Sequence, residues 1–228
     1  MEIKRLTLQT RDVDEMCKFY VKILGFPLLS QDEKHFRIKI GLSELTFTSE
    51  KVIGHPFYHF AFNIPSNQFR DAKAWLKDKT ALLLEDGEDE ADFPHLPAHA
   101  CYFEDQAGNI VELIARYHVN PNSETSFTTN SIYNISEIGL VVKDAPEVGN
   151  KMNEYGLYER DNDPISNSTL SFMHDRSKGV FVLLTGIGRR WLFSEKKSKL
   201  FPLEITLDNG LTLGVNKDLQ FFIGEGIR

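Results

Sequence analysis

Four segments of the chain share one pattern of alternating side chains, and this repeat limits the available folds more than any other feature. In each segment the second and fourth residues are apolar, and the residues of the other face begin with a charged or titratable one. The segments are Arg5–Thr10, His59–Ile64, Glu137–Val142 and Glu204–Asn209. A period of two is typical of β-strands whose two faces have different surroundings. The repeat therefore predicts four equivalent strands, each with one apolar and one polar face.

Each of the first three segments is followed by a helix signal and then by short strand-like runs. Asp12 and Glu15 form a capping box before an amphipathic stretch, and Pro146 marks a helix start just after Asp144. The fourth segment has no such helix signal. The chain therefore contains a strand, helix and strands unit, βαβββ, roughly three and a half times. One unit alone leaves a sheet edge open, so we expect units to pair into half-barrels with the helices outside.

The polar stretch between the second and third units divides the chain. It contains one proline and has no apolar period, which is typical of a linker. We expect residues 1–118 to form a domain from units 1 and 2, and residues 119–133 to be the linker. Residues 134–228 would then hold unit 3 and a truncated unit 4. The expected fold class is α+β, with repeated βαβββ units paired into half-barrels and the second pair incomplete.

One stretch of the second unit, YFEDQAGNIVEL from Tyr102 to Leu113, carries a specific resemblance. It is similar to the ending of the repeated unit in the vicinal oxygen chelate superfamily, which includes glyoxalase I, extradiol dioxygenases, fosfomycin-resistance transferases and bleomycin-binding proteins. Gln106 stands where that family usually has proline. The architecture resembles the family over the whole chain, whereas only the second unit matches closely as a motif. The resemblance implies the paired βαβββ fold.

The resemblance also implies where a metal would bind. In the family, metal ligands are the residue that opens the first strand of a unit and the acid in its last strand. In unit 2 these positions hold His59 and Glu112, and Glu112 is also the candidate catalytic carboxylate. A catalytic site needs three protein ligands, and only two can be identified here. We therefore expect that this site does not bind a divalent transition metal.

Unit 1 offers different residues at the equivalent places. Arg5 takes the place of the histidine, and Thr46 takes the place of the acid, with Glu44 an alternative two residues away on the same face. Arginine cannot coordinate a metal, but it can pair with a carboxylate or with an anionic ligand. We therefore expect Arg5 to pair with Glu112. Resemblance to the fosfomycin-resistance pattern turns Tyr102 toward the same cleft, so Arg5, Thr46 and Tyr102 are candidate substrate-binding residues.

The second half of the chain has no assigned site. Glu137 and Glu204 open units 3 and 4, and two acids without a histidine make a poor transition-metal site. Arg189 and Arg190 lie in the segment GRRWLFSEKK, residues 188–197, beside Trp191. We expect an exposed loop with a packed indole there, and a lid or anion contact is the alternative.

Composition limits the classes of partner that this chain is expected to bind. The net charge of -7 argues against nucleic acid and anionic membranes, since neither attracts an acidic protein. The two cysteines are too few for a disulfide framework, and no apolar run has the length of a membrane span, so we expect a cytoplasmic protein. The expected partner is a small molecule, and a homodimer is left open.

Three functions are compatible with this sequence. The first is a metal-dependent lyase or dioxygenase of the glyoxalase superfamily. The second is a metal-free protein that binds a small molecule, as drug-sequestering relatives do. The third is a degenerate family member with a structural or regulatory role. One fold serves many functions, so the fold does not choose between them.

Overall fold

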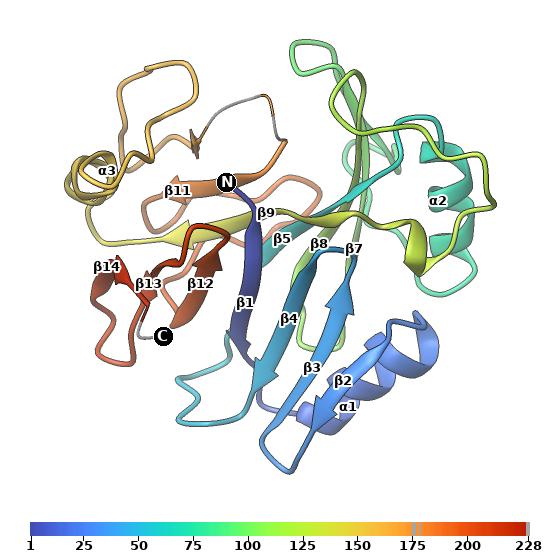
Figure 1. The fold of residues 1–228 in the computed structure, drawn as a ribbon, viewed down its shortest axis with the longest axis horizontal. Helices are drawn as coiled ribbons and strands as arrows, with labels where there is room; N and C mark the ends of the chain where they lie inside the picture. Colours follow the sequence, from blue (N-terminus) through green and yellow to red (C-terminus); the bar gives the residue numbers. More distant parts are fainter. Residues whose placement is uncertain (175–176, 178, 227–228) are drawn as a thin grey trace.

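The computed structural model describes residues 1–174, 177 and 179–226, which form two seven-stranded mixed sheets (Figure 1). The first sheet has the order β14-β13-β12-β1-β4-β3-β2 and the second has the order β10-β11-β9-β5-β8-β7-β6. The strands of the first sheet are β1 (Ile3–Gln9), β2 (Leu28–Gln31), β3 (His35–Ile40), β4 (Ser43–Thr48), β12 (Leu203–Leu207), β13 (Leu211–Val215) and β14 (Phe221–Glu225). Those of the second are β5 (His59–Ile64), β6 (Ala91–Phe93), β7 (Ala98–Glu104), β8 (Ile110–Arg116), β9 (Asn134–Val141), β10 (Ser171–Met173) and β11 (Phe181–Thr185).

The helices follow the first strands of units 1, 2 and 3, as the sequence predicts. They are α1 (Val13–Cys17), which continues as the π-helix η1 (Lys18–Ile23), α2 (Phe69–Lys77) and α3 (Ala145–Asn153); a 3-10 turn, η2 (Thr129–Ser131), precedes β9. The Asp12 side chain accepts a hydrogen bond from the Glu15 amide at 2.8 Å, and Asp144 caps α3 in the same way. Within the described residues no helix has the length and hydrophobicity to cross a membrane.

The pairing of units differs from the expected one. In the second sheet β5 pairs antiparallel with β9, and in the first sheet β1 pairs antiparallel with β12. Unit 2 therefore pairs with unit 3, and unit 1 pairs with the truncated unit 4. Paired βαβββ units with one incomplete pair are confirmed, whereas the prediction that residues 1–118 pair units 1 and 2 with each other is wrong.

Burial explains the pairing. Every residue of β5 and of β9 is buried, so each of these strands is covered on both faces. β1 and β12 instead each contain exposed or half-buried residues, so one face of each strand is partly open to solvent. The segment 119–133 also binds the end of β5: the Ser66 amide donates to Pro121 O at 3.2 Å, and the Tyr133 amide donates to Asn63 O at 2.9 Å. The expected linker therefore brings β9 directly to the edge of β5.

The apolar faces of the two sheets share one core. Phe47 on β4 lies 6.5 Å from Phe60 on β5, and Phe26 lies 5.7 Å from Phe62, measured between ring centroids. The hydroxyl of Tyr20 in η1 donates to Asp105 of unit 2 at 2.7 Å, within this buried region. The opposite, polar face of each sheet therefore lies outside this core, as the alternation of the first strands predicts.

Candidate metal centre and ligand pocket

Three titratable side chains meet on the polar face of the second sheet. Ala61 in β5 is the register partner of Glu112 in β8 on one side and of Glu137 in β9 on the other. His59 precedes Ala61 by two residues, so its side chain lies on the same face. The methyl side chain of Ala61 leaves the space between the two carboxylates open. Side chains from three neighbouring strands therefore point toward one place on this face of the sheet.

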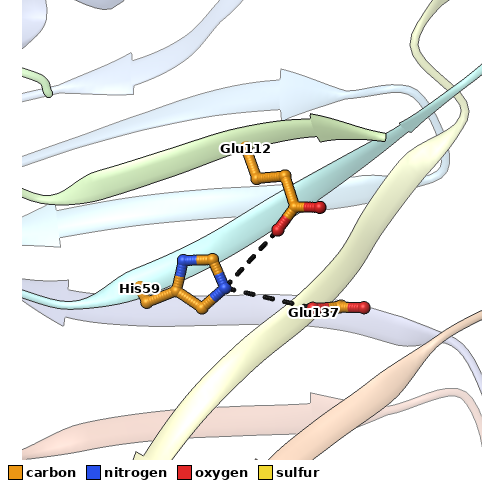
Figure 2. Close-up of side chains that lie close together, drawn as sticks. All are labelled: His59, Glu112 and Glu137. Atoms are coloured by element: carbon orange, nitrogen blue, oxygen red, sulfur yellow. Dashed lines mark ion pairs between the residues drawn. The ribbon is translucent and has the colours of Figure 1, made fainter. Parts of the chain in front are cut away.

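The three side chains approach each other closely, as Figure 2 shows. His59 Nε2 lies 3.6 Å from Glu112 Oε2 and 4.0 Å from Glu137 Oε2. The possible ligand atoms of the group all lie within 4.8 Å of one another, and all three residues are buried. His59 Nδ1 lies 3.1 Å from the carbonyl oxygen of Ile110, and donation to that oxygen places the proton on Nδ1. The lone pair of Nε2 then faces two carboxylates.

This arrangement fits a divalent cation. Burial and the neighbouring Glu137 raise the pKa of Glu112 well above 4.5, and burial lowers the pKa of His59. Without a cation, the site therefore disfavours both the ionised form of Glu112 and the protonated form of His59. A cation between the three side chains has the opposite effect on Glu112, because it stabilises both ionised carboxylates and accepts the lone pair of the neutral His59 Nε2. One imidazole and two carboxylates suit zinc, manganese, iron or nickel. The hydrogen bond from His59 to Ile110 is the outer contact that metal-binding histidines typically have.

Arg116, the last residue of β8, supports the site. Its Nη2 donates to Glu137 Oε1 and, at 3.3 Å, to Ser136 Oγ, and all three side chains are buried. Oε2 of Glu137 remains directed toward His59. Arg116 was not among the predicted site residues, although its position gave a signal: it follows Glu112 by four residues, so strand alternation places both on one face.

Two of the sequence-predicted site residues lie elsewhere. Arg5 is on the first sheet, where its side chain is 62% exposed and its Nε lies 3.5 Å from Glu44 Oε2. Thr46, on the same sheet, accepts a hydrogen bond from Arg37 Nε at 3.2 Å. The predicted pair between Arg5 and Glu112 is therefore wrong, because units 1 and 2 belong to different sheets that meet through their apolar faces, not through the polar faces that carry Arg5 and Glu112. Glu137 of unit 3 occupies the place facing His59 instead.

Tyr102 does lie beside the candidate metal centre formed by His59, Glu112 and Glu137. It is the register partner of Glu112, and both line one pocket that also includes His59 and Glu137. The ring of Tyr102 stacks on Phe193, with centroids 4.5 Å apart. The other walls are mostly apolar and include Phe93, Leu170, Phe172, Leu183, Trp191 and Leu192.

The segment of residues 188–197 packs against this pocket. Trp191 is buried, and its ring lies 5.0 Å from that of His59. A Cβ atom at Gly139 would lie 2.8 Å from Cη2 of the indole, so glycine is required for this packing. Glu85 holds the segment by accepting hydrogen bonds from the Arg190 guanidinium and, at 2.6 Å, from the Phe193 amide. The indole is packed as predicted, and the segment forms part of the pocket wall.

Comparison with known proteins agrees with this fold. Residues 2–113 match the model of the Glyoxalase/Bleomycin resistance protein/Dioxygenase superfamily, and residues 135–189 match that of the toxoflavin-degrading enzyme. The metallothiol transferase FosB of Staphylococcus epidermidis is 28% identical over 116 residues, which are 49% of this chain and 81% of that protein.

Two solved structures share the fold over most of this chain. A putative dioxygenase from Bacillus subtilis has a TM-score of 0.54 at 16% identity, and the match covers 81% of this chain and 63% of that one. A V278E mutant of glyoxalase I from Zea mays has a TM-score of 0.53 at 18% identity, covering 87% of this chain and 70% of that one. The family model over residues 2–113 shows that the chain contains a domain of the glyoxalase/bleomycin resistance protein/dioxygenase superfamily, the vicinal oxygen chelate superfamily that its sequence resembles, and the two solved structures show that the fold is shared.

Proposed function

We propose that the second sheet holds a divalent transition metal through His59, Glu112 and Glu137 and acts on a small molecule bound in the adjoining pocket. One observation carries this proposal. The Nε2 atom of His59 faces two buried carboxylates at 3.6 and 4.0 Å, while its Nδ1 atom lies beside a backbone carbonyl oxygen. Three protein ligands leave coordination positions open for a ligand, as catalytic sites do.

The residues around the centre have distinct roles in this proposal. A bound metal would supply Lewis-acid polarisation of adjacent ligand oxygens, the first requirement of both lyase and dioxygenase chemistry. Arg116 holds Glu137 in place. Glu112 has no arginine partner among the described residues and lies beside Tyr102, so we assign to it the acceptance of a proton from the ligand. Tyr102 and the apolar walls orient the ligand and exclude water.

A metal-free binding protein is the second candidate, and one observation favours it. Arg116 already gives Glu137 a counter-charge, so the pocket is partly neutralised without an ion. In that case the pocket would hold a small molecule through Tyr102, His59 and its apolar walls alone, as a drug-sequestering protein does.

Calorimetric titration of chelator-treated protein with Zn²⁺ and Mn²⁺ separates the two candidates. We expect one site per chain, with affinity strongly reduced in His59→Ala, Glu112→Gln and Glu137→Gln. Two matched variants serve as controls: His99→Ala, on the helix side of β7, and Glu44→Gln, on the first sheet. Absence of a site, or equal affinity in the His59 variant, would contradict the metal centre and favour the metal-free candidate.

A further inference from the structure

Arg189 lines the pocket but pairs with no acid of the described chain. Its Nη1 donates to the backbone oxygen of Arg190 at 3.1 Å, and its Cζ lies 5.6 Å from the centre of the Trp191 ring. The next residue behaves differently, since Arg190 binds Glu85 through both terminal nitrogens. Partial burial and the charge of Arg190 lower the pKa of Arg189, with no acid acting in the opposite direction. A partly desolvated cation is costly without a counter-charge.

The other charged groups around the pocket do not neutralise the positive charge of Arg189. Arg116 and Glu137 neutralise each other. A divalent cation beside Glu112 leaves an excess of positive charge, and Arg189 adds to it. An anionic group entering the pocket would remove this imbalance.

The walls of the pocket define the rest of the ligand. Phe93, Phe172 and Trp191 present aromatic rings, and leucine side chains fill much of the remaining lining. Such walls favour a flat apolar body over a sugar or a polar peptide. We propose that the ligand of this site is a planar, apolar anion and that Arg189 binds its negative group, a carboxylate or similar oxyanion. This inference rests on the proposed metal site and adds the class of ligand.

The test compares two molecules of the same shape and different charge, 2-naphthoate and 2-naphthamide, by titration into Zn²⁺-loaded protein. A charge-assisted hydrogen bond predicts that naphthoate binds roughly 10–100-fold more tightly than naphthamide. Arg189→Gln should remove this preference and leave the affinity for naphthamide unchanged. Arg189→Lys should keep part of it, and Arg5→Gln, on the other sheet, should keep all of it. Circular dichroism confirms that each variant is folded.

The outcomes separate this inference from the metal site. Equal binding of the two molecules, no binding of naphthoate, or a preference that persists in Arg189→Gln overturns the role of Arg189. If the preference persists in Arg189→Gln and disappears in His59→Ala, the metal binds the carboxylate, and the metal site stands while this inference fails. If no metal binds but the preference still depends on Arg189, the inference stands and the metal site fails.

Discussion

Replacing Arg116 by methionine tests how the buried charges support one another. Arg116 and Glu137 are both about 95% buried and form a direct ion pair, and the guanidinium also lies 5.3 Å from the ring of Phe181. Methionine keeps most of the apolar stem that lies against Gly179 and removes the guanidinium, with its charge and its hydrogen bonds to Glu137 and Ser136. Glu137 is then left beside Glu112 without a counter-charge.

The structure sets the size of the effect. Breaking a buried ion pair by removing one partner costs about 3–5 kcal/mol, because the other charge stays desolvated. For a chain of this length that loss corresponds to a fall in Tm of roughly 6–20 °C. A divalent cation bound at the triad supplies a replacement charge, so the loss should be smaller in the metal-loaded protein than in the metal-free one.

Urea and thermal denaturation of Arg116→Met and the parent protein, each in EDTA and in excess Zn²⁺, provide the measurement. The control is Arg5→Met, which removes an arginine from an exposed ion pair and should change stability by less than about 0.5 kcal/mol. A loss below about 1 kcal/mol for Arg116→Met in EDTA would refute the reasoning. So would a loss of equal size with and without Zn²⁺.

Two further predictions concern other buried groups. Tyr20→Phe removes the hydroxyl that donates to buried Asp105 at 2.7 Å and should cost about 1.5–3 kcal/mol in urea denaturation, whereas Tyr133→Phe, at an exposed hydrogen bond, should cost less than about 0.5. Burial raises the pKa of Glu112 above the unfolded value of 4.5 in the metal-free protein, so its contribution to stability is present below that value and is lost as the pH rises through the folded pKa. Glu112→Gln in EDTA should therefore gain stability relative to the parent as the pH rises from 5 to 8; a constant difference would contradict the shift.

The repeated units could be predicted because their signals are local. Alternation identified the first strand of each unit, and Asp12 and Asp144 identified the helix starts. The pairing of units could not be predicted in this way, since all four first strands alternate alike and each offers an edge for pairing. The choice depends on which strands are buried on both faces and on hydrogen bonds between the segment 119–133 and the end of β5, and both are properties of the assembled fold.

The candidate site was predicted in part for the same reason. His59 and Glu112 belong to one unit, so the resemblance of that unit to the family could identify both. Glu137 opens unit 3 at the place equivalent to His59, but assigning it to another half-barrel removed it from the ligand set and put Arg5 in its place. The wrong pairing therefore led to the wrong contact between Arg5 and Glu112. It also led to the expectation that no metal binds, which the metal titration described above tests.

A crystal soaked with Zn²⁺ and measured at the zinc absorption edge tests the central claim most directly, because anomalous scattering locates the ion itself. The structure predicts one strong peak between β5, β8 and β9, about 2.0–2.2 Å from His59 Nε2 and from one oxygen each of Glu112 and Glu137. A crystal of the His59→Ala variant should lack the peak. No peak at this point in the parent protein, or a peak bound only by residues outside the three, would contradict the proposed metal centre.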